Sequence, residues 1–395
     1  MKSKLSDVCI GSGTYGIAAS AVAYSLGLPT YLRITDINDD GTLDFSGLKS
    51  VNDPNSAKYY LSPNDIVFAR TGASTGRNYF YDGSDGNFVY AGFLIKFSVD
   101  PQKVNPKFVK YYCQSKDYFD WIASFNTGST RGNINAQTLG NMPIPNISRE
   151  QQNLLVGTLS AMDARIAENK RINHHLEEQC FAIYRHYFIE DALPSWKNGT
   201  IADLGMVIGG STPSKAKPEY YTKYGIAWVT PKDLSVNKNK FIARGADDIT
   251  DLGFRNSSTQ LMPRGTVLFS SRAPIGYIAI TSNEVCTNQG FKSVVPKQSI
   301  GTAYVYFFLK DNVQTIEGMA SGSTFKEISG SAMKGIPAVI PDPDTLSRFS
   351  EICNPVFEQQ ELLEQESARL AALRDTLLPR LMSGELSVAD IAGSK

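Results

Sequence analysis

Two long stretches of this chain carry apolar side chains at alternating spacings of three and four residues, the pattern of a helix that buries one seam. The first seam consists of Leu155, Leu159, Met162, Ile166, Asn169, Asn173, Leu176, Cys180, Ile183 and Tyr187. The second consists of Phe349, Ile352, Val356, Gln359, Leu363, Glu366, Leu370, Leu373 and Leu377. The pattern predicts coiled-coil helices over 148–191 and 342–390, each a rod of roughly 60 Å.

Capping residues mark the ends of these helices. Ser148 followed by Gln151 forms a capping box at the start of the first helix. Asp342-Pro343 is a typical N-cap and first helical residue for the second helix, and Gly384 is a natural stop.

The remaining sequence alternates short β-rich runs, bounded by Gly, Pro and Asn, with helical patterns. The expected strands are 65–69, 88–97, 226–230, 266–270 and 291–295, and the expected helices are 107–124 and 302–319. This mixture predicts an α+β fold, with mixed sheets in two domains over 1–147 and 192–341.

The two halves of the chain repeat one another at offsets of 194 to 200 residues. The segment Pro63–Phe68 matches Pro263–Leu268, Gly128-Ser129-Thr130 matches Gly322-Ser323-Thr324, and Pro143 matches Pro337. Such a duplication of domain plus helix predicts internal pseudo-two-fold symmetry, in which the two helices pair antiparallel and separate the two domains. The alternative is that each helix packs onto its own domain.

Composition and charge indicate an ordinary water-soluble protein. The chain has 395 residues and a net charge of zero, and its five cysteines lie far apart without a C-x-x-C pair. The start, Met1–Asp7, lacks the apolar region of a signal peptide, and no run is long enough to span a membrane. We therefore expect a cytoplasmic protein without a membrane partner.

Motifs for catalysis and for cofactors are weak. Gly11–Gly16 fits G-x-G-x-x-G, but the second copy loses that spacing, so a glycine-rich turn is the better interpretation. The three histidines, His174, His175 and His186, lie in the first long helix without zinc-ligand spacing. We expect no catalytic residue, no metal and no cofactor site in this chain.

Two polar, glycine-hinged loops recur in both halves, over 70–77 and 127–133 and over 270–277 and 321–327. Arg, Lys, Asn and hydroxyl side chains reach phosphates and base edges, whereas solvated turns of no further role are the alternative. The candidate DNA contacts are Arg70, Thr71, Arg77, Arg131, Asn133, Ser271, Arg272, Tyr277, Thr324 and Lys326.

Taken together, the chain resembles the specificity subunit of a type I restriction–modification system. The resemblance rests on the order of short motifs and on the repetition of that order in the second half. The motifs are Pro63–Phe68, the Gly128-Ser129-Thr130 loop, Pro143-Ile144-Pro145 leading into Ser148–Gln152, and the closing Leu377–Leu386. The second helix lacks the Glu-Gln-Gln that opens the first.

The resemblance implies a non-catalytic subunit whose two target-recognition domains read a bipartite sequence in double-stranded DNA. It implies two modification subunits, which use S-adenosylmethionine to methylate adenine N6, and two restriction subunits, which use ATP and Mg²⁺. A duplicated scaffold that bridges two protein or glycan ligands is the alternative. The target sequence and the spacer length depend on loop geometry and do not follow from the sequence.

Overall fold

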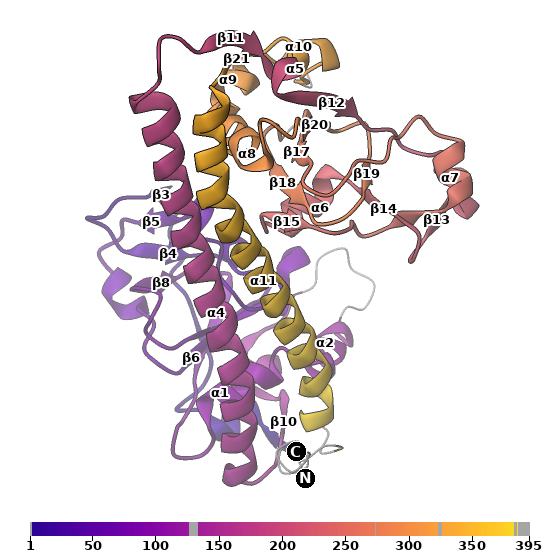
Figure 1. The fold of residues 1–395 in the computed structure, drawn as a ribbon. Helices are drawn as coiled ribbons and strands as arrows, with labels where there is room; N and C mark the ends of the chain where they lie inside the picture. Colours follow the sequence, from indigo (N-terminus) through magenta and orange to yellow (C-terminus); the bar gives the residue numbers. More distant parts are fainter. Residues whose placement is uncertain (1, 126–132, 273, 323–325, 383–384, 386–395) are drawn as a thin grey trace. The chain divides into compact units, whose positions relative to one another are not determined.

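The computed structural model describes residues 2–125, 133–272, 274–322, 326–382 and 385. The chain packs as two compact units (Figure 1). Unit 1 comprises Met1–Arg165 with Arg369–Lys395, and unit 2 comprises Ile166–Ala368. Each unit therefore contains one globular domain and part of each long helix.

Unit 1 is built from two four-stranded sheets and one two-stranded sheet. The first sheet is antiparallel and has the order β2 (Thr14–Tyr15), β9 (Leu94–Ser98), β6 (Asp65–Ala69), β7 (Asn78–Tyr81). The second is mixed and has the order β3 (Ala21–Ala23), β5 (Lys49–Val51), β4 (Thr30–Leu32), β8 (Phe88–Tyr90), with β4 and β8 parallel. The strands β1 (Lys2–Lys4) and β10 (Pro143–Pro145) form the small sheet, and the helices are α1 (Pro106–Tyr112), α2 (Lys116–Ala123) and α3 (Ala136–Gly140).

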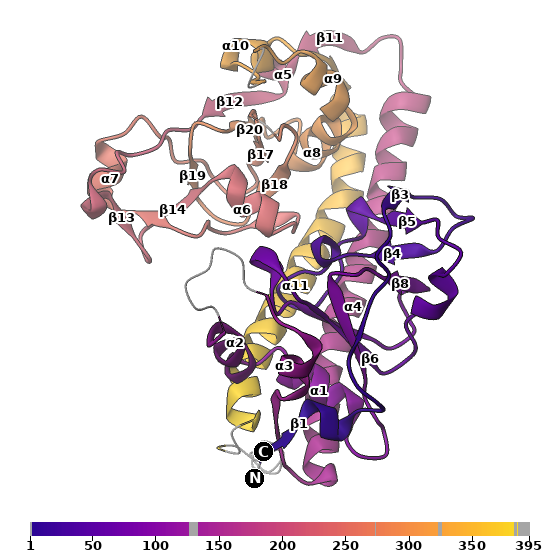
Figure 2. The same ribbon diagram turned by 180° about the vertical axis from the view of Figure 1, so that it is seen from behind.

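Unit 2 repeats this plan, and Figure 2 shows its strands from behind. Its five-stranded sheet has the order β12 (Gly205–Gly209), β20 (Lys292–Pro296), β17 (Val267–Phe269), β18 (Ile278–Thr281), β15 (Phe241–Ile242). Its four-stranded sheet has the order β13 (Tyr221–Thr222), β16 (Asp248–Ile249), β14 (Ile226–Val229), β19 (Cys286–Thr287). A pair, β11 (Lys197–Thr200) with β21 (Pro337–Ile340), corresponds to β1 with β10. The helices are α5 (Ile201–Leu204), α6 (Pro231–Val236), α7 (Asp251–Arg255), α8 (Thr302–Asp311), α9 (Val313–Gly318) and α10 (Gly330–Lys334).

The expected α+β class with mixed sheets is therefore confirmed, and several element boundaries are corrected. The expected strand 88–97 is two strands, β8 and β9, and the expected helix 302–319 is α8 and α9 with a break at Asn312. The expected helix 107–124 is also two helices. The first ends at Tyr112, and Ser115 caps the second, because its hydroxyl accepts from the Tyr118 amide at 3.3 Å.

The two long helices are α4 (Arg149–Arg185), which continues into a π-helical turn over His186–Glu190, and α11 (Pro343–Met382). The predicted capping box is present: Ser148 Oγ accepts from the Gln151 amide at 3.2 Å, and Gln151 Oε1 accepts from the Ser148 amide at 3.1 Å. Asp342 caps α11 by accepting from the Thr345 amide at 3.0 Å. The predicted stop at Gly384 lies outside the described residues.

The helices pair antiparallel within each unit. In unit 2, Asn169 Nδ2 donates to Ser367 Oγ at 3.2 Å, and Asn173 Nδ2 donates to the Gln360 carbonyl at 3.2 Å. In unit 1, Arg374 Nη1 lies 3.0 Å from Asp163 Oδ1. Partner numbers on α11 fall as those on α4 rise, so the predicted antiparallel pairing is confirmed.

The ends of both helices also belong to the cores of the domains. In unit 1, Leu155 and Leu159 of α4 share one buried cluster with Leu377 and Leu381 of α11 and with the strands and helices of the domain. In unit 2, Tyr184 and Phe349 lie in the corresponding cluster. The two long helices thus pair with each other and also pack onto the domains, although these arrangements were predicted as alternatives.

A buried cation links the sheet of unit 2 to both helices. Lys240, just before β15, is 8% exposed and donates to Glu177 Oε2 on α4 at 2.7 Å and to Gln360 Oε1 on α11 at 2.9 Å. Its Nζ also lies over the rings of Phe357 and Tyr306. Burial lowers the pKa of Lys240 to about 8, and Glu177 opposes that shift.

Two further charged groups complete this network. Glu177 Oε1 accepts from the Tyr306 hydroxyl at 2.9 Å and pairs with Lys310. Burial alone would raise the pKa of Glu177, but Lys240 and Lys310 hold it below its ordinary value. Burial raises the pKa of Glu364 to about 7, although its carboxylate accepts from the Lys240 and Phe241 amides.

Candidate nucleic-acid interface

The first predicted loop of unit 1 is a tight turn that leaves β6 and enters β7. The Gly76 amide donates to the Ala69 carbonyl at 2.9 Å, and Gly76 has φ of +89°. A Cβ at Gly76 would come within 2.7 Å of Ile122, so glycine is required on both grounds. The Tyr118 hydroxyl closes the turn by donating to the Gly76 carbonyl at 2.5 Å.

Unit 2 builds the same turn after β17. The Gly276 amide donates to the Ser270 carbonyl at 3.1 Å, Gly276 has φ of +95°, and a Cβ there would meet Val313 at 2.5 Å. The two turns therefore share one construction on different side chains.

In each unit, the structure brings the two predicted loops together. Thr71 forms a β-bridge with Asn133, and the Ile134 amide donates to the Arg70 carbonyl at 2.9 Å. In unit 2, Arg272 forms a β-bridge with Glu327, and the Ile328 amide donates to the Ser271 carbonyl at 2.9 Å. We call residues 70–77 with 133–134 loop pair 1, and residues 270–272 and 274–277 with 327–328 loop pair 2.

These hydrogen bonds give a correspondence between the two loops that differs by one residue from the match in the sequence. Because Ile134 bonds to Arg70 and Ile328 bonds to Ser271, Arg70 corresponds to Ser271, not to Ser270 as the sequence match has it. By the same criterion, Thr71 corresponds to Arg272. A shorter turn in the second copy explains the shift, since the Gly76 and Gly276 turns still coincide.

Loop pair 2 holds its charges in an internal ion pair. Arg272 Nε lies 3.1 Å from Glu327 Oε2, and Lys292 Nζ lies 3.5 Å from Glu327 Oε1. Burial alone would raise the pKa of Glu327, but Arg272 and Lys292 hold it below its ordinary value. Loop pair 1 has the neutral residues Thr71 and Asn133 at the corresponding bridge, so the two surfaces differ in charge.

The other predicted contacts differ in how far they face solvent. Arg77 is held within unit 1, because Nε lies 2.6 Å from Asp39 Oδ1 and Nη1 donates to the Ile37 carbonyl at 3.2 Å. Ser271 is fully buried and Tyr277 is half-buried, whereas Asn133 and Lys326 are exposed. Arg131 and Thr324 lie outside the described residues.

A hollow of about 670 Å³ in unit 2 was not predicted. Its lining includes Lys215, Lys232, Arg244 and Gln289, and Thr212 donates a hydrogen bond to Gln289 Oε1. Cations and amides of this kind suit phosphates and base edges. The frequency of lysine between 215 and 240 is the sequence signal that could have indicated this surface.

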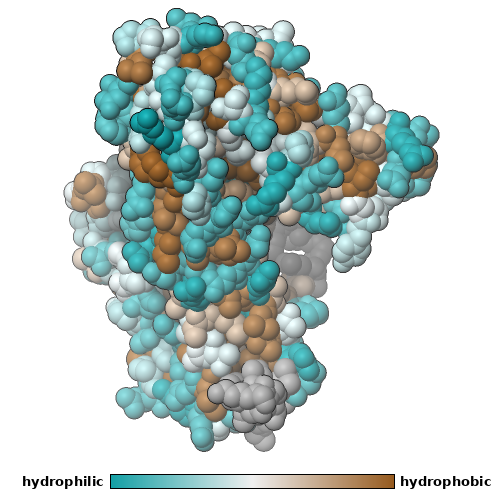
Figure 3. All heavy atoms as spheres, viewed as in Figure 1, coloured by the Kyte–Doolittle hydropathy of each residue, from teal (hydrophilic) through white to brown (hydrophobic). Residues whose placement is uncertain are grey.

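The predicted seam residues of the long helices are unevenly buried. Leu159 is 0%, Leu363 5% and Leu377 8% exposed, whereas Leu373 is 46% exposed. The half-buried members are Met162, Ile166, Asn173, Leu176, Ile183, Tyr187, Val356, Glu366 and Leu370. Gln359 and Ile352 are exposed, while neighbouring Gln360 and Cys353 are buried, because α11 faces both α4 and a domain core. Figure 3 accordingly shows apolar and polar residues mixed on the exposed faces of both helices.

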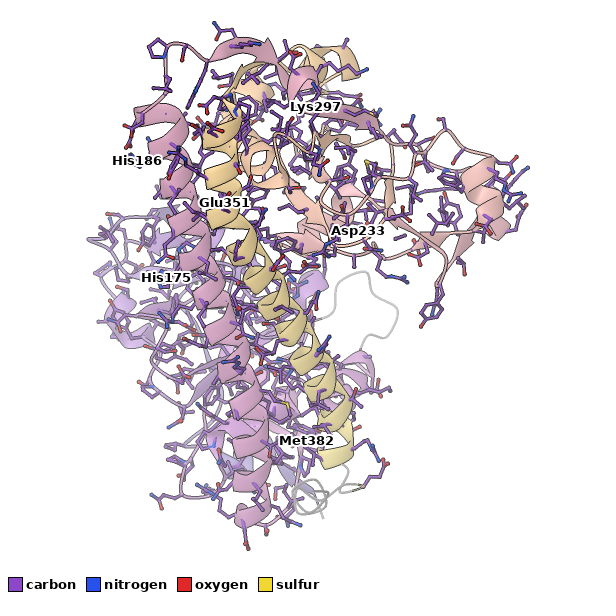
Figure 4. The ribbon with its side chains drawn as sticks, viewed as in Figure 1. His175, His186, Asp233, Lys297, Glu351 and Met382 are labelled. Carbon is purple, nitrogen blue, oxygen red and sulfur yellow. The ribbon has the colours of Figure 1, made fainter. Side chains whose placement is uncertain are left out.

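The described residues contain no group of three or more His, Cys, Asp or Glu side chains that could hold a metal ion. His175 lies in α4, and His186 begins the π-helical turn that follows it (Figure 4). No described helix is both long enough and apolar enough to cross a membrane.

Comparison with known families tests the resemblance directly. A family model described as the type I restriction modification DNA specificity domain matches residues 2–178 and again residues 194–372. The chain belongs to this family. It has two DNA specificity domains, and it is a recognition subunit rather than a catalytic one. The alternative of a duplicated scaffold finds no support in the comparisons.

Curated relatives and a solved structure agree with this assignment. The chain is 37% identical over 184 residues to the type I restriction enzyme MjaIX specificity subunit of Methanocaldococcus jannaschii, a match that spans 44% of this chain and 42% of that protein. It is 22% identical over 411 residues to the HindI specificity subunit of Haemophilus influenzae, covering 84% of this chain and 89% of that protein. The S subunit of a type I system from M. genitalium shares the fold, with a TM-score of 0.57 at 18% identity over 96% of this chain and 95% of that one.

Proposed function

We propose that this specificity subunit assembles with two modification subunits and two restriction subunits, and that it directs both activities to one bipartite DNA target. The modification subunits bind S-adenosylmethionine and methylate adenine N6. The restriction subunits bind ATP and Mg²⁺. The complex acts in the cytoplasm, and the role of this chain is to recognise the DNA target.

The observation that carries the proposal is the doubled loop pair. Each unit closes the same glycine turn and joins the same two loops by a backbone hydrogen bond, yet the bridge residues are Thr71 and Asn133 in one and Arg272 and Glu327 in the other. A shared scaffold with unlike side chains is what two different half-sites require.

The antiparallel helix pair supports a role in spacing. Because α4 and α11 contribute to both units, we expect their length to set the number of base pairs between the half-sites. On α11, Ile352 and Leu362 are 39% and 59% exposed, and such apolar side chains are available for a modification subunit to cover.

Co-expression with a modification subunit tests the proposal. We expect adenine methylation at one split motif in cells, salt-sensitive binding of duplex DNA by the purified complex, and a mass equal to one specificity and two modification subunits. A complex that methylates adenines without a common motif, or that binds no DNA at low salt, contradicts it.

A further inference from the structure

Three residues from distant segments of unit 1 are linked at the end of its antiparallel sheet, Tyr15 to Arg70 through their side chains and Arg70 to Phe93 through the backbone. Tyr15 is paired with Ile95 in β9, and the Arg70 amide donates to the Phe93 carbonyl at 3.0 Å. Side chains alternate between the faces of a sheet with a period of two residues. Tyr15 and Phe68 both pair with Ile95 and therefore share its sheet face, while Arg70 directly follows β6 and Phe93 directly precedes β9.

The aromatic ring of Tyr15 supports the cation of Arg70. The guanidinium carbon of Arg70 lies over this ring, 5.0 Å from its centroid. The Tyr15 hydroxyl accepts from the Ala136 amide at 3.1 Å, which fixes the ring. Among the described residues, nothing accepts a hydrogen bond from the buried Arg70 Nε.

Both aromatic side chains face solvent. Tyr15 is 41% exposed and Phe93 is 59% exposed. Large apolar side chains grouped on a surface around a cation are typical of a contact surface more than of a solvated turn. We call Tyr15, Arg70 and Phe93 the aromatic–arginine cluster.

Unit 2 folds without this cluster. The backbone hydrogen bonds that relate Arg70 to Ser271 also relate Phe93 to Gly290, since the Ser271 amide donates to the Gly290 carbonyl at 2.8 Å. The strand register of β12 with β20 likewise relates Tyr15 to Gly209. The same scaffold thus forms with Gly, Ser and Gly at these positions, so the fold does not need the cluster.

We propose that the aromatic–arginine cluster is the base-reading element of unit 1, in which Arg70 recognises a guanine and Phe93 packs against the adjoining base. Arginine donates in bidentate fashion to O6 and N7 of guanine, and Tyr15 holds the planar guanidinium in place for this contact. A phosphate contact needs only the charge and not a fixed aromatic platform. The proposal rests on the proposed function and adds which residues of unit 1 discriminate.

The test compares Arg70→Ala, Phe93→Ala and the parent, each as the full chain with its modification subunit. Lys58→Ala is the charge control, because Lys58 is exposed in the same unit. The methylated motif is mapped in cells, and binding is measured on duplexes that carry each base at every position of the first half-site.

For Arg70→Ala we expect affinity for the parent target to fall about 5- to 150-fold and preference for guanine to vanish at one position of one half-site. Phe93→Ala should weaken selection at the adjoining position. Lys58→Ala should keep the parent motif. Unchanged selection at the remaining positions of the first half-site serves as the internal sign that unit 1 is folded in each variant.

An unchanged motif and unchanged affinity for both variants overturn the proposal. An equal loss on all duplexes with the motif intact also overturns it, because that outcome identifies a phosphate contact. If the parent complex selects no motif at all, the proposed function fails before any variant is compared, so the two failures are distinguishable.

Discussion

Replacing Glu177 with methionine tests how the buried charges hold unit 2 together. The substitution leaves the Lys240 ammonium, 8% exposed, with Gln360 Oε1 and aromatic rings as its remaining close partners. Removing one partner of a buried ion pair costs about 3–5 kcal/mol, because the other charge stays desolvated. We therefore expect Glu177→Met to be among the most destabilising single changes in unit 2.

The reciprocal change should be mild. In Lys240→Met, Glu177 still accepts from Tyr306 and pairs with Lys310, whose side chain is 36% exposed. Methionine also fits among the rings that now surround Nζ. We expect a cost of about 1–2 kcal/mol. The double variant should be more stable than Glu177→Met alone, because it removes the unpaired buried charge.

Urea unfolding followed by tryptophan fluorescence measures these differences. In a Trp121→Phe background, the remaining tryptophans, Trp196 and Trp228, both report on unit 2. At roughly 3 kcal/mol per molar urea, the expected loss for Glu177→Met moves the midpoint by about 1–1.7 M. Lys297→Met, at the exposed lysine labelled in Figure 4, is the control and should change stability by less than about 0.5 kcal/mol. Equal midpoints for Glu177→Met and the double variant would refute the reasoning.

Three further predictions follow from other features. Glu364→Gln should remove a pH dependence: the folded-state pKa of about 7 exceeds the ordinary 4.5, so the parent loses stability relative to the variant as pH rises from 4.5 to 7. If the urea midpoints of the two proteins changed equally between pH 4.5 and pH 7, that result would contradict the burial of this carboxylate. Heptads inserted together after Ile166 and after Ser367 add about 10 Å to both helices. We expect a spacer longer by about three base pairs or loss of methylation, and an active protein with the parent spacer refutes the spacing role. Exchanging residues 1–147 for another such domain should change one half-site of the methylated motif, and a change in both half-sites argues against modular recognition.

Local patterns in the sequence predicted much of this fold. The strand over 65–69 is observed with the same bounds, and the capping residues Ser148 and Asp342 act as expected. Each depends on residues within a few positions of one another, where spacing fixes geometry. The internal repeat likewise identified loops that the structure joins.

Long-range packing decided what the sequence could not predict. The stacking of Arg70 on Tyr15 and the pairing of Arg77 with Asp39 join segments far apart in the chain. From the sequence alone, Lys240 is expected at the surface. In the structure it is buried and donates hydrogen bonds to α4 and α11. The seam of α11 was predicted from a single periodicity, whereas the burial of its side chains depends on both α4 and a domain core.

The packing of Leu377, Leu378, Leu381 and Met382 into the core of unit 1 has a consequence for synthesis. Unit 2 is a continuous stretch of chain, so all of it has been synthesised before α11 is complete. Unit 1 begins earlier in the chain but needs residues 377–382, which are synthesised after unit 2, and until then Leu155 and Leu159 lack part of their cover. The core of unit 1 is therefore completed after that of unit 2, and a stop codon near residue 375 would damage the domain formed by residues 1–165.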